Sequence, residues 1–135
     1  AGARSYYRLE EAARDLTGMP YTFPTHQGRA AERILCSVVP LQGKVVLSNG
    51  LFDTTRANVE ASGARGIDLT APEPTSGENP FGGDMDLAAF DAAMKEHGKA
   101  VAFVVMTVTN NTAGGQAVSL ENLRQVSARC RTNPA

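Results

Sequence analysis

The spacing of apolar residues predicts helices and short strands that alternate along the chain. Leu9, Ala13 and Leu16 recur at helical spacing and Gly18 follows them, so a first helix is predicted over residues 5–17. The run 101–108 is almost continuously apolar and of strand length, which is typical of a strand buried on both faces of a parallel sheet. We therefore predict that this run forms the centre of the sheet.

The same patterns place the other elements. Asp86 and Ser119 are expected helix caps, because each precedes apolar residues at helical spacing. Further helices are predicted over 25–36, 53–62 and 86–98 and after 119, and further strands over 21–24, 44–47 and 66–70. This alternation predicts an α/β domain with a mostly parallel sheet and flanking helices, which binds ligands at the carboxyl ends of its strands.

The composition is that of one folded domain. The 135 residues are 42% hydrophobic and 20% charged, and a formal net charge of -1 provides no excess of positive charge for binding nucleic acid or anionic lipid. No apolar run approaches the ~20 residues that cross a bilayer, so no membrane partner is expected. Cys36 and Cys130 form no disulfide or metal pattern, which predicts reduced thiols in a cytoplasmic protein. His26 and His97 have no neighbouring ligands, so no metal site is predicted.

The first candidate site follows the predicted strand 21–24. Here Thr25 is an expected helix cap, and Gln27, Gly28 and Arg29 combine free backbone N–H groups of a helix start with a guanidinium. Such donors suit a phosphate or a carboxylate, and Gly28 lets a ligand approach closely. The alternative is an ordinary capped helix with a surface arginine.

The second candidate follows the apolar run 101–108. Residues 110–116 include Asn110, Asn111, Gln116 and two glycines, more side-chain amides and glycines than an ordinary connection requires. The alternative is a plain loop.

The third candidate begins at Phe52, again just after a predicted strand. An aromatic face followed by Asp53, two threonines and Arg56 is suited to holding a flat polar ring by stacking and hydrogen bonds. The alternative is that Phe52 belongs to the core and that Asp53 or Thr54 caps the next helix.

These segments together resemble the β-eliminating lyases that use pyridoxal 5'-phosphate, the family of tryptophanase and tyrosine phenol-lyase. The resemblance covers residues 2–128 and is closer to the tryptophanase group. It is carried by Arg4, Ser5, Tyr6 and Tyr7 and by the segments 24–29, 52–55, 80–86 and 109–116, in the family's order. The implied fold is part of the large, cofactor-binding domain of the type I, aminotransferase-like fold, filling residues 1–135 without a second domain.

The resemblance implies a role for each matching residue. Gln27, Gly28 and Arg29 match the segment that binds the cofactor phosphate, and Phe52 matches the aromatic residue that stacks on the pyridine ring. Asn111 matches the asparagine that binds the phenolic oxygen of the ring and helps to hold the substrate, while Asp53 stands on the substrate side. The implied reaction is β-elimination of an aromatic amino acid to pyruvate, ammonia and a leaving group.

The residues that would perform covalent chemistry are not found. Lys44, Lys95 and Lys99 are the only lysines, and all three are predicted at solvated positions that match no Schiff-base lysine. We therefore expect an internal fragment of such a lyase, inactive in isolation, whose residues 129–135 depart from the family pattern and form a frayed or altered tail. The alternatives are a non-catalytic cofactor-binding or assembly remnant, and another pyridoxal-phosphate enzyme such as an aldolase or aminotransferase.

An interaction with other chains is expected as well. A sheet that lacks later strands would leave an apolar edge at 101–108, which invites self-association. The predicted partners are an amino-acid substrate and a second copy or a complementing chain.

Overall fold

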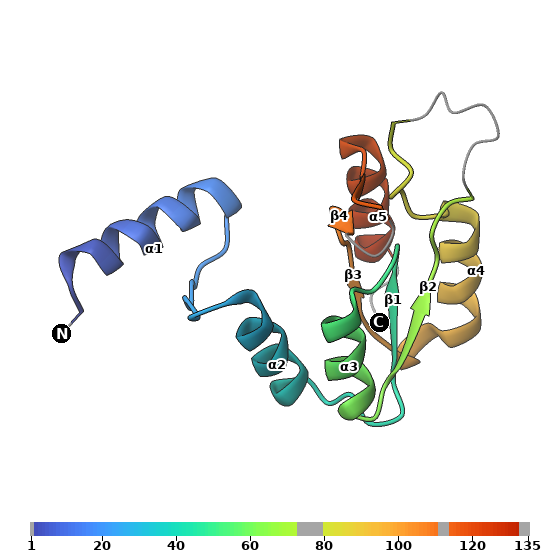
Figure 1. Ribbon diagram of the computed structural model, residues 1–135, viewed down its shortest axis with the longest axis horizontal. Helices are drawn as coiled ribbons and strands as arrows, with labels where there is room; N and C mark the ends of the chain where they lie inside the picture. The colour runs from blue at the N-terminus through green and yellow to red at the C-terminus, as the bar shows by residue number, and fades with distance from the viewer. Residues whose placement is uncertain (1, 73–79, 111–113, 133–135) are drawn as a thin grey trace.

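The structure is a computed structural model that describes residues 2–72, 80–110 and 114–132. It consists of α1 (Arg4–Thr17), α2 (Gly28–Val38), β1 (Val45–Ser48), α3 (Asp53–Ala61), β2 (Arg65–Asp68), α4 (Leu87–His97), the 3₁₀ turn η1 (Gly98–Ala100), β3 (Val101–Val105), β4 (Thr109–Asn110), β5 (Gln116–Ala117) and α5 (Leu120–Thr132). Figure 1 shows the three longer strands surrounded by α3, α4 and α5, with α1 extending away from them. The predicted α/β class is confirmed.

Three parallel strands form the main sheet in the order β2-β1-β3. The pairs Val45↔Arg65 and Val45↔Val101 mark the common start of the three strands. All four residues of β1 are buried, whereas β3 is mostly half-buried and has one neighbouring strand in the described sheet. The prediction that residues 101–108 form the centre was therefore wrong. The chain returns from β2 through α4 to the far side of β1, and this crossover decides which strand is central.

Helices cover both faces of the sheet because the side chains of a strand alternate in direction. On one face Val45 and Leu47 pack with residues of α4 and α5, and on the other Val46 packs with residues of α2 and α3. The first cluster is Val45, Leu47, Met85, Phe90, Ala93, Met94, Val101 and Val126; the second is Cys36, Leu41, Val46, Leu51, Val59 and Ala64. The result is a three-layer arrangement of helices, sheet and helices.

Two parts of the chain differ from the prediction in secondary structure. The segment 21–24 forms no strand, and its Tyr21 and Phe23 rings stack with centroids 6.4 Å apart while remaining exposed. Residues after Val105 leave the main sheet and form the antiparallel hairpin β4–β5, with Thr109 opposite Ala117. Local β propensity did not create a strand at 21–24, because none of the described strands pairs with this segment.

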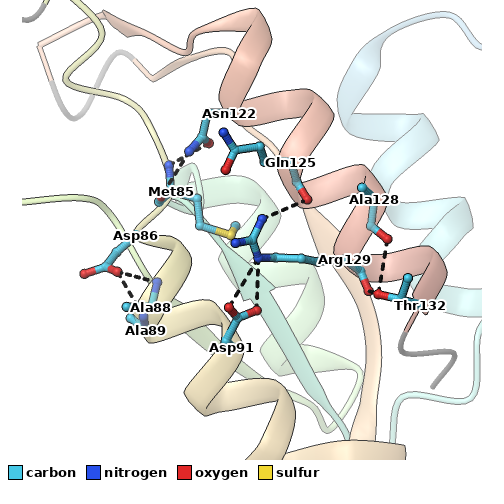
Figure 2. A network of polar contacts seen from close by, with 10 residues as sticks. All are labelled: Met85, Asp86, Ala88, Ala89, Asp91, Asn122, Gln125, Ala128, Arg129 and Thr132. Atoms are coloured by element: carbon cyan, nitrogen blue, oxygen red, sulfur yellow. Dashed lines mark hydrogen bonds and ion pairs between the residues drawn. The ribbon is translucent and has the colours of Figure 1, made fainter.

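The last helix continues beyond the point where fraying was predicted. α5 runs to Thr132, and Arg129 forms an ion pair with Asp91 of α4, with 3.1 Å between Nε and Oδ1. Figure 2 shows this pair together with Asn122, which bonds to the backbone of Met85. Because these contacts hold the start of α5 on Met85 and its end on α4, the predicted frayed tail was wrong for residues 129–132.

The N-terminal arm, defined as residues 4–38, contributes little to the core. No residue of α1 is buried, and Cys36 is the only buried residue of α2. Most of the strongly exposed large apolar side chains of the described residues lie in this arm: Tyr7, Leu9, Leu16, Met19, Tyr21, Phe23, Ile34, Leu35 and Val38. Such a surface is typical of a segment that another surface covers.

The helix caps predicted at Asp86 and Ser119 are present, and Asp86 gives a direct test. Asp86 Oδ1 accepts hydrogen bonds from the N–H groups of Ala88 and Ala89, each 2.9 Å long. We expect Asp86→Ala to lower the free energy of unfolding by about 1 kcal/mol, measured by urea denaturation. Asp86→Asn, which keeps an acceptor, should lose much less; equal losses in the two variants would contradict the capping role.

Candidate functional site

The candidate site lies where β1 and β3 end. Parallel neighbours leave a sheet at the same edge, so the exit of β1 toward Phe52 and the exit of β3 toward the hairpin β4–β5 lie near each other. Two of the three segments predicted from the sequence therefore belong to one edge of the sheet. The remaining segment, at the start of α2, belongs to a helix that contacts the first turn of α3.

Phe52 and Asp53 stand at the start of α3. Phe52 is the N-cap residue in an extended conformation, and its C=O accepts a hydrogen bond of 2.9 Å from the Arg56 N–H. Its side chain is half-buried and belongs to neither core cluster, while Asp53 is exposed. No side chain caps α3, so the alternative of a cap at Asp53 or Thr54 was wrong. This geometry leaves an aromatic face beside an exposed carboxylate.

The guanidinium of Arg56 forms ion pairs with two carboxylates of the protein. Its Nη2 donates to Asp68 Oδ2 at the end of β2 over 2.6 Å, and its Nη1 lies 3.3 Å from Glu60 Oε1. The second oxygen of Asp68 accepts a 2.9 Å bond from the Leu51 N–H. Arg56 therefore supports the β1 exit, whereas the sequence predicted that it would help to hold a ligand ring.

Gln27, Gly28 and Arg29 form the exposed beginning of α2. Gln27 is the N-cap residue with no side-chain cap, and neither the Gly28 nor the Arg29 N–H has a partner within the described residues. The Thr25 hydroxyl donates to the Gln27 C=O at 2.9 Å, so the expected cap at Thr25 was wrong. A Cβ added at Gly28 would meet open space. Free N–H groups, an accessible glycine and a guanidinium thus occupy the same helix end.

Glu32 connects α2 to the first turn of α3. One turn after Gly28, its carboxylate accepts hydrogen bonds from the hydroxyls of Thr55 at 2.6 Å and Thr54 at 3.4 Å. Thr55 is buried and lies in the first turn of α3. The sequence analysis missed Glu32, because only the packing of α2 against α3 reveals its partners. This contact packs α2, whose start is the first predicted segment, against the third predicted segment.

The segment 109–116 is only partly described. Asn110 pairs with Gln116 across the hairpin, and Gly114 and Gly115 both have a φ of 72°, in the left-handed region that favours glycine. Asn111 lies outside the described residues. The connection before α4 packs against this hairpin, since the Gly83 N–H donates to the Ala117 C=O at 3.0 Å.

The three lysines lie at the opposite end of the sheet. Lys44 directly precedes β1, and Lys99 lies in η1 directly before β3; the Lys44 Nζ donates to the Lys99 C=O over 2.8 Å. Lys95 is in the last turn of α4, which leads into η1. All three are therefore near the amino ends of the parallel strands, away from Phe52.

Other chemistry is not assembled in the described part of the chain. No group of three or more His, Cys, Asp or Glu side chains within it is placed to hold a metal ion. Cys36 and Cys130 are free thiols, as predicted. Burial raises the pKa of both thiols, and the Glu32 carboxylate raises that of Cys36 further against the opposing effect of Arg33. Neutral thiols are poor nucleophiles.

Comparison with known proteins decides the family. A family model for beta-eliminating lyases matches residues 1–134, almost the whole chain. The chain belongs to the beta-eliminating lyase family. The match includes residues 129–134, which the sequence analysis had placed outside the family pattern.

The relatives in this family are tryptophanases and tyrosine phenol-lyases. The chain is 48% identical to the tryptophanase of Salinibacter ruber over 134 residues and 49% identical to that of Hyphomonas neptunium over 126, covering 98% and 92% of this chain. It is 39% identical to the tyrosine phenol-lyase of Symbiobacterium thermophilum over 133 residues, or 96% of this chain. The predicted closeness to the tryptophanase group is confirmed. The chain spans 28% of the length of the two tryptophanases and 29% of that of the tyrosine phenol-lyase.

Proposed function

We propose that this chain is part of a pyridoxal 5'-phosphate-dependent carbon-carbon lyase of the tryptophanase type. The reaction would divide an aromatic amino acid by β-elimination into pyruvate, ammonia and the leaving group. The observation that carries the proposal is the connection through Glu32, which accepts hydrogen bonds from Thr54 and Thr55. It packs α2, whose start carries the free N–H groups and the Arg29 guanidinium, against the first turn of α3, which directly follows Phe52. Membership of the lyase family and 48–49% identity to tryptophanases support it.

The donor set fits the proposed cofactor. A phosphate monoester needs several N–H donors and positive charge, and the start of α2 combines the Gly28 and Arg29 N–H groups with the Arg29 guanidinium and the helix dipole. A flat pyridine ring needs an aromatic face outside the core, as Phe52 presents. Residues 1–135 would then form a single, partial cofactor-binding domain.

Each residue would have a distinct task. Gln27, Gly28 and Arg29 would hold the phosphate, Phe52 would stack on the ring, and Asn111 would donate to its phenolic oxygen. The exposed carboxylate of Asp53 would face the substrate. When bound, the cofactor supplies an electron sink that stabilises negative charge on the substrate α-carbon.

The lysine that attaches the cofactor is proposed to come from outside these 135 residues. Lys44, Lys95 and Lys99 all lie at the amino edge of the sheet, and the candidate site lies at the carboxyl edge. This placement also favours a second candidate function, that of a module that binds the cofactor or assists assembly without performing the reaction.

A titration with pyridoxal phosphate separates these functions. We expect saturable binding in the visible absorption spectrum, and no lysine labelled after borohydride reduction and peptide mapping. A single labelled lysine would show that this chain itself attaches the cofactor. Absence of any saturable binding would overturn the proposed cofactor site. Turnover restored by a complementing chain would favour the lyase over the non-catalytic module.

The remaining proposals concern location and partners. We propose a cytoplasmic protein with an amino-acid substrate. The formal net charge of -1 argues against a polyanionic partner. None of the described helices is sufficiently long and apolar to pass through a bilayer.

We further propose that α1 packs on α1 of a second copy. Its first half carries Arg4, Arg8 and Glu10 and its second half Glu11, Arg14 and Asp15, so the halves have net charges of opposite sign and an antiparallel pair brings them together. Leu16, which is 87% exposed, would be covered. We expect a dimer by light scattering that Leu16→Glu dissociates. Leu120→Glu, at the 69% exposed start of α5, is the matched control, and its dissociation to the same extent would contradict this interface.

A further inference from the structure

Asn49 extends the pairing of the two strands whose exits form the candidate site. It directly follows β1, three residues before Phe52, and is only 3% exposed. Its Oδ1 accepts a hydrogen bond from the Thr107 N–H at 2.8 Å, and its Nδ2 donates to the Thr107 C=O at 2.9 Å. The last backbone pair of these strands is Ser48 with Val105. The side chain of Asn49 therefore holds the exits of β1 and β3 together beyond the sheet itself.

The same side chain also holds the connection before α4. The Asn49 Nδ2 donates to the Gly83 C=O at 2.7 Å, and the N–H of Gly83 donates to the Ala117 C=O of β5 at 3.0 Å. On the backbone, the Asn49 C=O accepts a hydrogen bond from the Thr70 hydroxyl after β2. The exits of all three parallel strands are thus connected through one residue.

We propose that Asn49 is the positioning residue of the candidate site. It would hold Phe52, at the exit of β1, in place relative to the exit of β3 and the connection before α4. The inference rests on the proposed function, because it assigns Asn49 an effect on cofactor binding without contact to the cofactor.

The chemistry of the side chain explains why asparagine is needed. An amide provides two donors and one acceptor, and all three are used by Thr107 and Gly83. An alanine would leave buried backbone groups without partners. An aspartate would place a buried negative charge against two carbonyl oxygens, which is more costly.

Asn122 provides a matched control. It is 7% exposed and binds the backbone of Met85 in the same two-bond manner, with both distances 2.9 Å (Figure 2). It joins α5 to the residue preceding Asp86 and does not join two strand exits. Asn49→Ala and Asn122→Ala therefore remove similar hydrogen bonds, but only the first should disturb the candidate site.

The experiment compares wild type, Asn49→Ala and Asn122→Ala in pyridoxal phosphate titrations. The readouts are the dissociation constant, the circular dichroism induced in the cofactor's visible band, and thermal unfolding. We expect both variants to lose stability, but only Asn49→Ala to raise the dissociation constant, by about tenfold, and to weaken the induced dichroism. Equal changes in both variants, or an unchanged dissociation constant in Asn49→Ala, would overturn the inference.

Two further results are also informative. If wild type itself fails to bind the cofactor, the proposed function fails first and the inference fails with it. If Asn49→Ala does not fold, Thr70→Val makes a milder change by removing only the hydroxyl that supports the Asn49 backbone. We then expect a severalfold rise in the dissociation constant, and no rise would overturn the inference.

Discussion

Gly83→Ala is expected to destabilise the protein by about 2 to 4 kcal/mol, because the added methyl group collides with backbone and breaks hydrogen bonds at the strand exits. A Cβ at this position would lie 2.7 Å from the backbone carbonyl oxygen of Gln116 and 2.9 Å from that of Ala117. Room for the methyl group can be made only by moving Gly83 and β5 apart. That movement breaks the hydrogen bond from the Gly83 N–H to the Ala117 C=O or the one from Asn49 Nδ2 to the Gly83 C=O. The measurement is the free energy of unfolding from urea denaturation.

Gly82→Ala is the matched control. Its Cβ would meet the side chain of Gln116, whose Oε1 lies 3.0 Å away and can move aside. Neither glycine has a positive φ, so alanine is not strained at either position. We expect Gly82→Ala to cost less than about 1 kcal/mol. Similar losses at 82 and 83 would show that the backbone contact of Gly83 is not the cause.

Arg29→Ala is expected to weaken binding of pyridoxal phosphate by about 1.5 to 3 kcal/mol, roughly tenfold to a hundredfold in the dissociation constant. The reason is the loss of a charge-assisted hydrogen bond to the phosphate at the start of α2. Arg29 is exposed and has no side-chain partner within the described residues, so removing it should leave folding unchanged. The measurement is an absorption titration, with far-ultraviolet circular dichroism to verify the fold.

Arg33→Ala is the control for charge. Arg33 lies one helical turn after Arg29 on α2 and is also exposed, so its removal changes the net charge by the same amount. We expect it to change the dissociation constant by less than about threefold, since a solvent-exposed charge that forms no hydrogen bond to the phosphate contributes little. If both variants weaken binding equally, the effect is general electrostatic attraction, and a phosphate contact at Arg29 is contradicted.

Local signals in the sequence predicted most elements to within a few residues. The helix that Asp86 caps begins at Leu87, and Ser119 accepts a hydrogen bond from the Asn122 N–H at 3.0 Å, as expected of a cap. Caps and helical spacing act within about one turn of chain, so they are visible in the sequence. Thr25 failed as a cap because its hydroxyl bonds to Gln27 instead.

The candidate site was only partly predictable. The sequence indicated Gln27, Gly28 and Arg29 from their donor chemistry and Phe52 from its place after a strand. It did not indicate Glu32 or Asn49, and it indicated Gly83 only as part of the matching segment 80–86, although each of the three joins segments of the site. Asn49 bonds to Gly83 and Thr107, which are 34 and 58 positions away, and no spacing rule reaches that far.

The sequence by itself determined the class of fold, the identity of the family and the three segments that carry candidate chemistry. Those properties depend on local periodicity and on residue types in a given order. The tertiary structure alone decided that β1 is central, that Arg56 is engaged by Asp68, and that all three lysines lie at the amino edge. These follow from which strands pair and how the chain crosses between them, and pairing depends on contacts between residues that are distant along the chain.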